Sequence, residues 1–354
     1  MKTIKVGSDF SGVGAFDYAI GRVAEQKGFK VENVFACDMD KHARKSYLAN
    51  HGDPGYYPEN VYEREIPTES LDVYMTSPPC QAFSIAGARR GKNDPRGILF
   101  FNSLEFIEKN QPRFFIFENV KGLLSDDNGK TFSEWINLLG GKSVNGLPVL
   151  FPYENAVNYH VYWQVINAKE HGIPQNRERV FIIGIRDDSD NNFRFPKTEH
   201  LKKRLKDVLL DSVDKKYFLS AKMVSQLMNN GVDTDHLIPG DYSNTLRCGG
   251  GRSLTEKHCF DMIKVIGNTH PSGNGMNGNV FDCEDISPTL LTNKGDSIKI
   301  KHQRIRRLTP RECFRLMDFP ESFEFVVPDS QLYKQAGNSI VVRVLEKVLN
   351  NLNL

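Results

Sequence analysis

The stretch that best indicates the fold is IKVGSDFSGVGAF, residues 4–16. Its apolar start, Ile4–Val6, is typical of a short strand, and the turn Asp9–Phe16 leads into a helical pattern. Glycines let the backbone approach a ligand closely, so this turn predicts a nucleotide-like cofactor at the carboxyl end of a strand. Asp38 follows the next apolar run, about twenty residues on, where Rossmann-type sites bind ribose hydroxyls.

Five further apolar runs of strand length alternate with longer mixed segments up to about residue 190. They are Val31–Ala36, Val73–Thr76, Phe114–Phe117, Tyr159–Ile166 and Arg179–Ile185. This alternation is typical of βαβ units around a parallel sheet, and it predicts an α/β, Rossmann-like domain. The last segment carries an apolar stripe at helical spacing, so we expect a final helix, capped by Asn338 or Ser339, that packs on the sheet.

The amino-acid composition changes after Arg186, where predicted turns rich in Asp, Asn, Ser and Gly dominate. A chain of 354 residues also exceeds the usual size of one domain. We therefore expect a catalytic and cofactor-binding domain over residues 1–188, completed by residues 328–354. A smaller, irregular domain would span residues 189–327.

The net charge of +2 is too small to attract nucleic acid globally, so such a partner would need local basic stretches. The sequence offers a basic loop between two glycines, a Gly-rich loop, and a cationic run with little acid to balance it. Their members are Arg89, Arg90 and Lys92 in the first, Arg247 and Arg252 at the second, and Lys301, Arg304, Arg306, Arg307 and Arg311 within Lys299–Arg315. A solvated basic face is the alternative for each stretch.

Other classes of protein are disfavoured. The six cysteines are scattered without any CxxC spacing, which argues against a disulfide framework and against a metal site. No apolar run reaches bilayer-spanning length, and the N-terminus lacks the features of a signal peptide, so we expect a cytoplasmic protein with no membrane partner.

Cys80 is the candidate nucleophile. It lies in the turn TSPPCQAFS, residues 76–84, directly after the strand predicted at Val73–Thr76. Two prolines restrict the backbone there and would hold the thiol in one direction, which favours attack on a bound substrate. An inert cysteine in a Pro-Pro turn is the alternative.

Glu118 ends the next predicted strand and should face the same crevice as Cys80. Burial would raise the pKa of its carboxyl group, so that it could keep a proton and hydrogen-bond N3 of a pyrimidine under thiolate attack. Arg177 and Arg179 precede another strand and would bring two guanidinium groups to this edge. Structural ion pairing is their alternative role.

Together these segments resemble the cytosine-5 DNA methyltransferase family, whose ordered motif blocks they match outside about residues 190 to 300. The matching blocks are Phe10–Gly14, Pro78-Pro79-Cys80-Gln81, Glu118-Asn119-Val120, Gln175–Arg179, Arg307–Glu312 and Gln335-x-Gly337-Asn338-Ser339. The gap corresponds to the family's variable target-recognition region. The resemblance therefore identifies the expected domain at 189–327 as the target-recognition domain.

The resemblance implies S-adenosylmethionine as the cofactor and a flipped cytosine in duplex DNA as the substrate. Cys80 would attack carbon-6, Glu118 would contact N3 and the exocyclic amine, and Arg177 and Arg179 would support the site. The implied cofactor contacts are Phe10, Ser11, Gly12, Val13, Gly14, Asp38, Met39, Asn60, Pro79, Leu99, Asn338 and Ser339. We expect a monomer, with a restriction endonuclease as a genetic rather than a physical partner.

Two positions depart from the family pattern. Ser8-Asp9 replaces the usual Asp-Leu before Phe10, and Asn60 stands where an aspartate is common. These departures bear on the cofactor contacts and not on the chemistry at Cys80.

Three alternatives remain. A related branch methylates tRNA, but it has Thr where Ser84 stands and a shorter target region. A catalytically inactive DNA-binding protein would not need Cys80, Glu118 and Arg179 intact. An NAD-dependent oxidoreductase would need a further glycine near Asp17 to complete the dinucleotide pattern.

Overall fold

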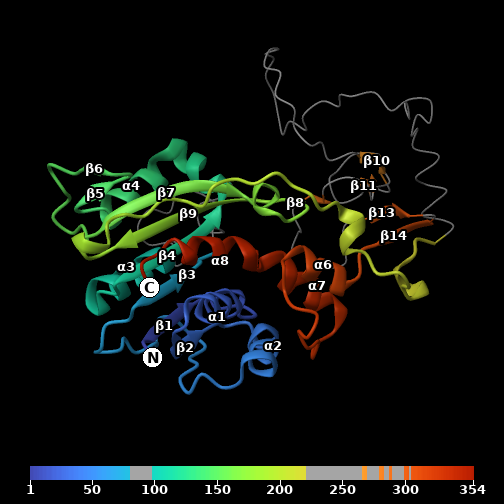
Figure 1. Ribbon diagram of the computed structural model, residues 1–354, viewed down its shortest axis with the longest axis horizontal. Coiled ribbons are helices and arrows are strands. Elements are labelled where there is room, and N and C mark those ends of the chain that lie inside the picture. Colours follow the sequence, from blue (N-terminus) through green and yellow to red (C-terminus); the bar gives the residue numbers. More distant parts are fainter. Residues whose placement is uncertain (80–97, 221–264, 269–278, 283–286, 289–298, 303) are drawn as a thin grey trace, which may run out of the picture.

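An eight-stranded sheet organises the chain (Figure 1). The structure is a computed structural model that describes residues 1–79, 98–220, 265–268, 279–282, 287–288, 299–302 and 304–354. The order of strands in the sheet is β2-β1-β3-β4-β9-β7-β5-β6. These strands are β1 Thr3–Asp9, β2 Lys30–Cys37, β3 Val73–Thr76, β4 Phe114–Val120, β5 Ser143–Val144, β6 Leu147–Pro148, β7 His160–Asn167 and β9 Glu178–Ile185. All six strands predicted from the sequence are confirmed.

Helices cover both faces of this sheet, and short 3-10 turns connect the elements. In the described residues the α-helices are α1 Ala15–Lys27, α2 Lys41–His51, α3 Ile98–Asn110, α4 Lys130–Leu139, α6 Pro310–Leu316, α7 Asp329–Asn338 and α8 Val342–Asn350. The 3-10 helices are η2 Lys121–Gly129, η3 Ala168–His171, η4 Asp188–Asp190, η5 Leu205–Val208 and η6 Lys215–Tyr217.

Two apolar cores lie on opposite faces of the sheet, because successive side chains of a strand point to opposite sides. Phe114 and Ile116 of β4 belong to the first core, with α1, α6, α7 and α8. Phe115 and Phe117 belong to the second core, with α3 and α4. The α/β class predicted from the alternating pattern is confirmed.

The expectation of a parallel sheet is correct only for part of it. β2, β1, β3 and β4 run parallel, but β9 is antiparallel to both β4 and β7. Only residues 168–177 connect β7 to β9, whereas a parallel crossover needs about a dozen residues or more. The antiparallel pairing places the start of β9 beside the carboxyl end of β4, with Arg179 opposite Val120.

The final helix packs on the sheet as expected, with Leu345, Val348 and Leu349 in the first core. The predicted cap is wrong, since Asn338 is the last residue of α7 and α8 begins at Val342. The backbone N–H of Val342 donates to the carbonyl of Met317 at 3.0 Å. A tertiary acceptor therefore satisfies this helix end in place of a side chain.

The region expected to form the second domain contains a four-stranded sheet of order β10-β11-β13-β14, and β12 pairs with β8 (Figure 1). These strands are β8 Gln175–Asn176, β10 Val265–Asn268, β11 Asn279–Asp282, β12 Ser287–Pro288, β13 Lys299–His302 and β14 Arg304–Arg307. Phe193, Leu205 and Tyr217, from the start of this region, belong to the first core. The proposed division at residues 188 and 328 stays a prediction.

Candidate active site

The end of β4 and the start of β9 bring three of the predicted catalytic residues, Glu118, Arg177 and Arg179, to one edge of the sheet. Glu118, near the end of β4, is only 7% exposed. The Nε of Arg179 lies 3.1 Å from its Oε1. The predicted proximity of Glu118 and Arg179 is thus present in the structure.

Burial and two arginines act in opposite directions on the pKa of Glu118. Burial raises the pKa of its carboxyl group, and this effect outweighs the opposing attraction of Arg179 and Arg177. Burial lowers the pKa of the Arg177 guanidinium to about 9, and the positive charge of Arg179 acts in the same direction. A raised pKa makes this carboxyl group easier to protonate, and it lies beside cationic side chains.

Arg177 connects this edge to the C-terminal segment. Its guanidinium donates to the carbonyl of Gly337 at 2.9 Å and to that of Ser339 at 2.8 Å. Residues that lie 160 positions apart in the sequence are thereby joined. The side chain of Arg177 is accordingly a link between the Glu118 edge and the turn at Asn338.

Asn119 is a site residue to which sequence reasoning gave no role. Its side-chain amide donates to the carbonyl of Pro78 at 3.0 Å, and both groups are buried. This bond ties the end of β4 to the turn that leads to Cys80. Its position directly after Glu118, in the motif Glu118-Asn119-Val120, could have indicated a role at the site. Cys80 itself lies outside the described residues.

The turn after β1 has the backbone expected of a close ligand approach. Phe10, Gly12 and Gly14 all have positive φ angles, of 57°, 57° and 81°. A Cβ placed on Gly12 would meet no atom within 4 Å, so space is open beside this turn. Ser11 and Val13 lie in the same turn, with Val13 buried in the first core.

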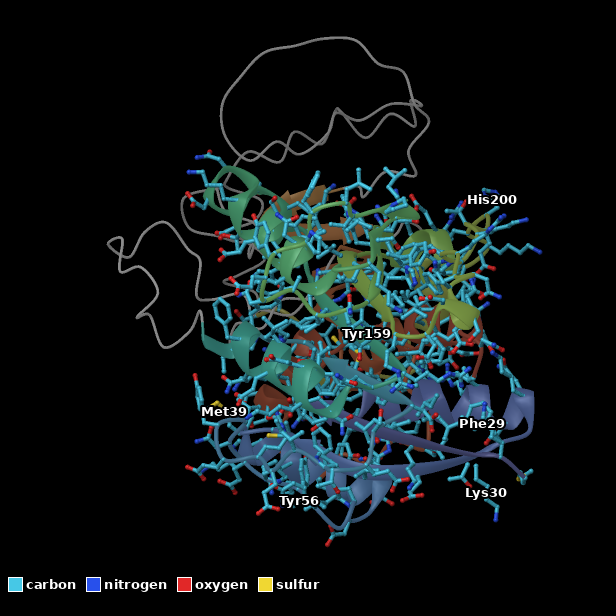
Figure 2. All side chains as sticks on the ribbon, turned by 90° about the vertical axis from the view of Figure 1, so that its left-hand side faces the viewer. Phe29, Lys30, Met39, Tyr56, Tyr159 and His200 are labelled. Carbon is cyan, nitrogen blue, oxygen red and sulfur yellow. The ribbon has the colours of Figure 1, made fainter. Side chains whose placement is uncertain are left out.

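Asp38 is fixed directly beside that turn. Its carboxylate accepts the backbone N–H of Gly12 and that of Asp40, each at 2.8 Å. Burial raises the pKa of Asp38, against the opposing effect of these two amides. Met39 follows it with 84% of its surface exposed, and Figure 2 shows its side chain at the surface. The open turn, a fixed carboxylate and an exposed apolar side chain fit an adenosine-bearing cofactor.

The remaining predicted cofactor contacts lie on other elements. Pro79 and Asn338 are exposed, Ser339 is partly buried, and Leu99, in the first turn of α3, packs against the second core. Asn60 lies in a turn, where its Oδ1 accepts the N–H of Tyr62 at 3.1 Å. The backbone N–H of Asp38 contacts the carbonyl of Pro58 at 3.4 Å, so the segment that carries Asn60 runs beside Asp38.

The cationic run Lys299–Arg315 is only partly a basic surface, contrary to the expectation that little acid balances it. Arg306 is buried and forms a bidentate ion pair with Glu312. Arg311 stacks on Phe325, with its guanidinium carbon 4.0 Å from the ring centre. Counting charges along the run did not show that Glu312, six residues after Arg306, is its buried partner.

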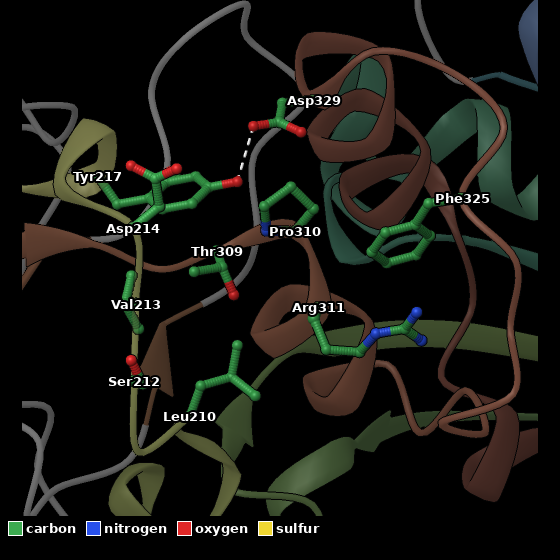
Figure 3. Close-up of a pocket in the computed structure, with 10 residues that line it drawn as sticks. All are labelled: Leu210, Ser212, Val213, Asp214, Tyr217, Thr309, Pro310, Arg311, Phe325 and Asp329. Atoms are coloured by element: carbon green, nitrogen blue, oxygen red, sulfur yellow. Dashed lines mark hydrogen bonds between the residues drawn. The ribbon is translucent and has the colours of Figure 1, made fainter.

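Arg311 also lines a cavity of about 270 Å³ between residues 210–217, α6 and the start of α7 (Figure 3). Two carboxylates, Asp214 and Asp329, face this cavity, and the Tyr217 hydroxyl donates to Asp329 at 2.7 Å. None of the predicted catalytic or cofactor residues lines it. The predicted DNA contacts Arg89, Arg90, Lys92, Arg247 and Arg252 lie outside the described residues.

The described part of the chain contains no helix that is both long and apolar enough to span a membrane. Nor does it hold a group of three or more His, Cys, Asp or Glu side chains suited to a metal ion. Cys37 and Cys313 are buried free thiols, and cysteine commonly behaves as a small apolar core residue.

Comparison with known proteins identifies the family. The model of the C-5 cytosine-specific DNA methylase family matches residues 4–353. The chain is 35% identical to Type II methyltransferase M.HpaII of Haemophilus parainfluenzae, over 96% of this chain and 89% of that protein. It is 30% identical to orphan methyltransferase M.SPRI of Bacillus phage SPR, over 99% and 98% of the two chains.

A solved structure has the same fold. The Entamoeba histolytica methyltransferase EhMeth superimposes with a TM-score of 0.66 at 16% identity, covering 99% of this chain and 97% of that one. The chain belongs to the C-5 cytosine-specific DNA methylase family. It is accordingly classed among the enzymes that methylate carbon-5 of cytosine in DNA, and the resemblance stated from the motifs is confirmed.

Proposed function

We propose that this methyltransferase transfers a methyl group from S-adenosylmethionine to carbon-5 of a flipped cytosine in a specific duplex DNA sequence, through a covalent adduct with Cys80. The observation that carries the proposal is the buried Glu118–Arg179 pair at the edge where the Pro78–Pro79 turn leads to Cys80. A carboxyl group with a raised pKa at that position suits hydrogen bonding to N3 of a cytosine.

Each residue has a distinct task in this mechanism. The cytosine leaves the duplex stack, because its ring is otherwise out of reach of a side chain. The Cys80 thiolate adds to carbon-6 while protonated Glu118 donates to N3, which makes the ring more electrophilic. Arg179 holds the Glu118 carboxyl group in place. Loss of the carbon-5 proton and elimination of Cys80 later restore the aromatic ring.

Groups from three parts of the chain would hold the cofactor. The open turn Phe10–Gly14 and the carboxylate of Asp38 would bind it, and the Asn60 segment lies beside them. Asn338 and Ser339 would contribute from the C-terminal segment, to which Arg177 is hydrogen-bonded. When bound, S-adenosylmethionine supplies an electrophilic methyl group on a sulfonium.

DNA would be read by the region of residues 189–327, with Arg89, Arg90, Lys92, Arg247 and Arg252 as phosphate or base contacts. Relatives named as Type II methyltransferases support the further proposal that this chain protects DNA from a restriction endonuclease. The endonuclease would be a genetic partner, and the methyltransferase would act as a monomer.

Labelled methyl transfer tests the proposal. The protein is incubated with labelled S-adenosylmethionine and either duplex DNA or tRNA, and bisulfite sequencing then locates the modified base. We expect label in DNA, at one cytosine of a short recurrent sequence. Label in tRNA alone would support the tRNA alternative, and label in neither substrate would support an inactive relative.

A further inference from the structure

Three buried polar side chains meet at the carboxyl end of β1, beneath the turn that begins at Phe10. The Nε of Arg64 donates to Oδ1 of Asp9 at 2.9 Å, and the hydroxyl of Tyr74 donates to Oδ2 at 2.6 Å. The side chains of Asp9 and Arg64 are only 1% and 2% exposed. The guanidinium carbon of Arg64 also lies 4.5 Å from the centre of the Phe106 ring. A buried charge is costly unless it is paired, so Asp9 and Arg64 form one unit.

The pair joins two segments that are distant in sequence. Asp9 immediately precedes Phe10, whose φ of 57° is a conformation that residues other than glycine rarely adopt. Arg64 lies at the C-terminal end of the segment that carries Asn60. A single ion pair therefore reaches from the Phe10 turn to the Asn60 segment.

The other end of that segment has its own anchor. The guanidinium of Arg44, in α2, donates to the carbonyl of Tyr57 at 2.7 Å and to that of Pro58 at 2.9 Å. Asn60 thus lies between one arginine that holds the segment against α2 and a second that holds it against β1. Loss of Arg64 would release one of the two anchors and leave the other unchanged.

We infer that Arg64 is a positioning residue for the cofactor, which with Asp9 sets the Asn60 segment relative to the Phe10 turn. This inference rests on the proposed function, because it concerns the site there assigned to S-adenosylmethionine. Asp9 stands where the family pattern has a leucine, so the ion pair with Arg64 is not part of that motif. Arg64 acts through the backbone that it holds and needs no contact with the reacting atoms.

The test separates positioning from charge compensation. Arg64→Met leaves Asp9 buried without its cation, whereas the double variant Asp9→Leu/Arg64→Met removes both charges. Arg306→Met is the matched control, since it also breaks a buried arginine–carboxylate pair but lies at the junction of β14 and α6. For each full-length protein, calorimetry gives the Kd for S-adenosylmethionine, thermal unfolding gives Tm, and hydrogen exchange follows the amides of residues 57–63.

We expect the double variant to recover most of the Tm lost in Arg64→Met, and yet to bind S-adenosylmethionine about tenfold or more weakly than the unaltered protein. Its amides at 57–63 should exchange faster, and its affinity for duplex DNA should not change. Arg306→Met should lose Tm with an unaltered cofactor Kd.

A double variant with the unaltered cofactor Kd would overturn the inference, since the pair would then only neutralise charge. If Arg64→Met does not fold, the double variant alone decides the question. Failure of the unaltered protein to bind S-adenosylmethionine would overturn the proposed function itself.

Discussion

Two buried arginine–glutamate pairs of this molecule have the same chemical composition and different surroundings. The carboxylate of Glu312 accepts hydrogen bonds from both terminal nitrogens of Arg306, at 2.7 and 2.8 Å. It also accepts hydrogen bonds from the backbone N–H groups of Thr309 and Leu210. Glu118 is reached at 3.1 Å by the Nε of Arg179. The first carboxylate has its acceptor positions filled, whereas the second keeps capacity for another partner.

This difference supports a structural role for the Glu312 pair and the catalytic role proposed for Glu118. A carboxylate that accepts four hydrogen bonds joins β14, α6 and the segment at Leu210. The buried carboxyl group of Glu118 is contacted by Arg179, has a raised pKa and keeps the capacity for a further hydrogen bond. Burial and charge alone do not separate the two pairs, but the number of donors does.

The largest expected effect is on stability at the Glu312 pair. Arg306→Met leaves a fully buried carboxylate without its cation, and the loss should be about 3–5 kcal/mol in the free energy of unfolding. Denaturant unfolding measures it. Methylation per folded molecule should be unchanged at low temperature, and a selective loss of rate would place this pair in the active site.

At the other pair, Glu118→Gln should slow methylation by about a hundredfold or more, the usual scale for a lost acid–base group. The amide keeps the shape of the side chain but cannot carry the transferable proton. Single-turnover rates at saturating DNA and cofactor measure the effect. Unaltered rates would remove Glu118 from the mechanism.

The pH dependence of the unaltered protein and of Glu118→Gln tests the same role for Glu118. Because burial raises the pKa of Glu118 above 4.5, the folded state holds this proton more tightly than the unfolded chain. The group therefore favours folding at acid pH and opposes it as the pH rises through the raised pKa. The rate should fall along with the protonated fraction, and Glu118→Gln should lack that alkaline decline. An identical decline in both proteins would contradict the assignment.

A smaller effect is expected at Asn119. Asn119→Ala removes the bond to the Pro78 carbonyl, and the resulting freedom of the turn before Cys80 should lower the methylation rate by about tenfold. Cofactor affinity should be retained, since the Phe10 turn is untouched. Loss of cofactor binding with an unaltered rate at saturation would show that Asn119 acts elsewhere.

The six main strands could be predicted because each is an apolar run between turn signals. The direction of β9 was missed, although residues 168–177 are too short for a parallel crossover. The start of α8 was also missed, because its first N–H is satisfied by Met317, which lies outside the local sequence. Contacts of this kind arise from tertiary packing and leave no local pattern.

At the site, strand ends and ordered motifs were enough to place Glu118 and Arg179 together. The roles of Asp9 and Arg64 were not foreseen, since a carboxylate in place of leucine does not indicate which distant cation will pair with it. Arg306 was counted with a basic surface for a similar reason. A charge in a sequence does not reveal whether its partner is water or a buried side chain.

The central claim is that Cys80 forms a transient covalent bond to a cytosine that is bound beside Glu118, at the carboxyl end of β4. A duplex that carries 5-fluorocytosine at the target position should trap this bond in the presence of S-adenosylmethionine, because the fluorine cannot leave as a proton does. Mass spectrometry should find the adduct on Cys80 and find none in Cys80→Ser. Unmodified Cys80, in protein that binds both the duplex and the cofactor, would contradict the account.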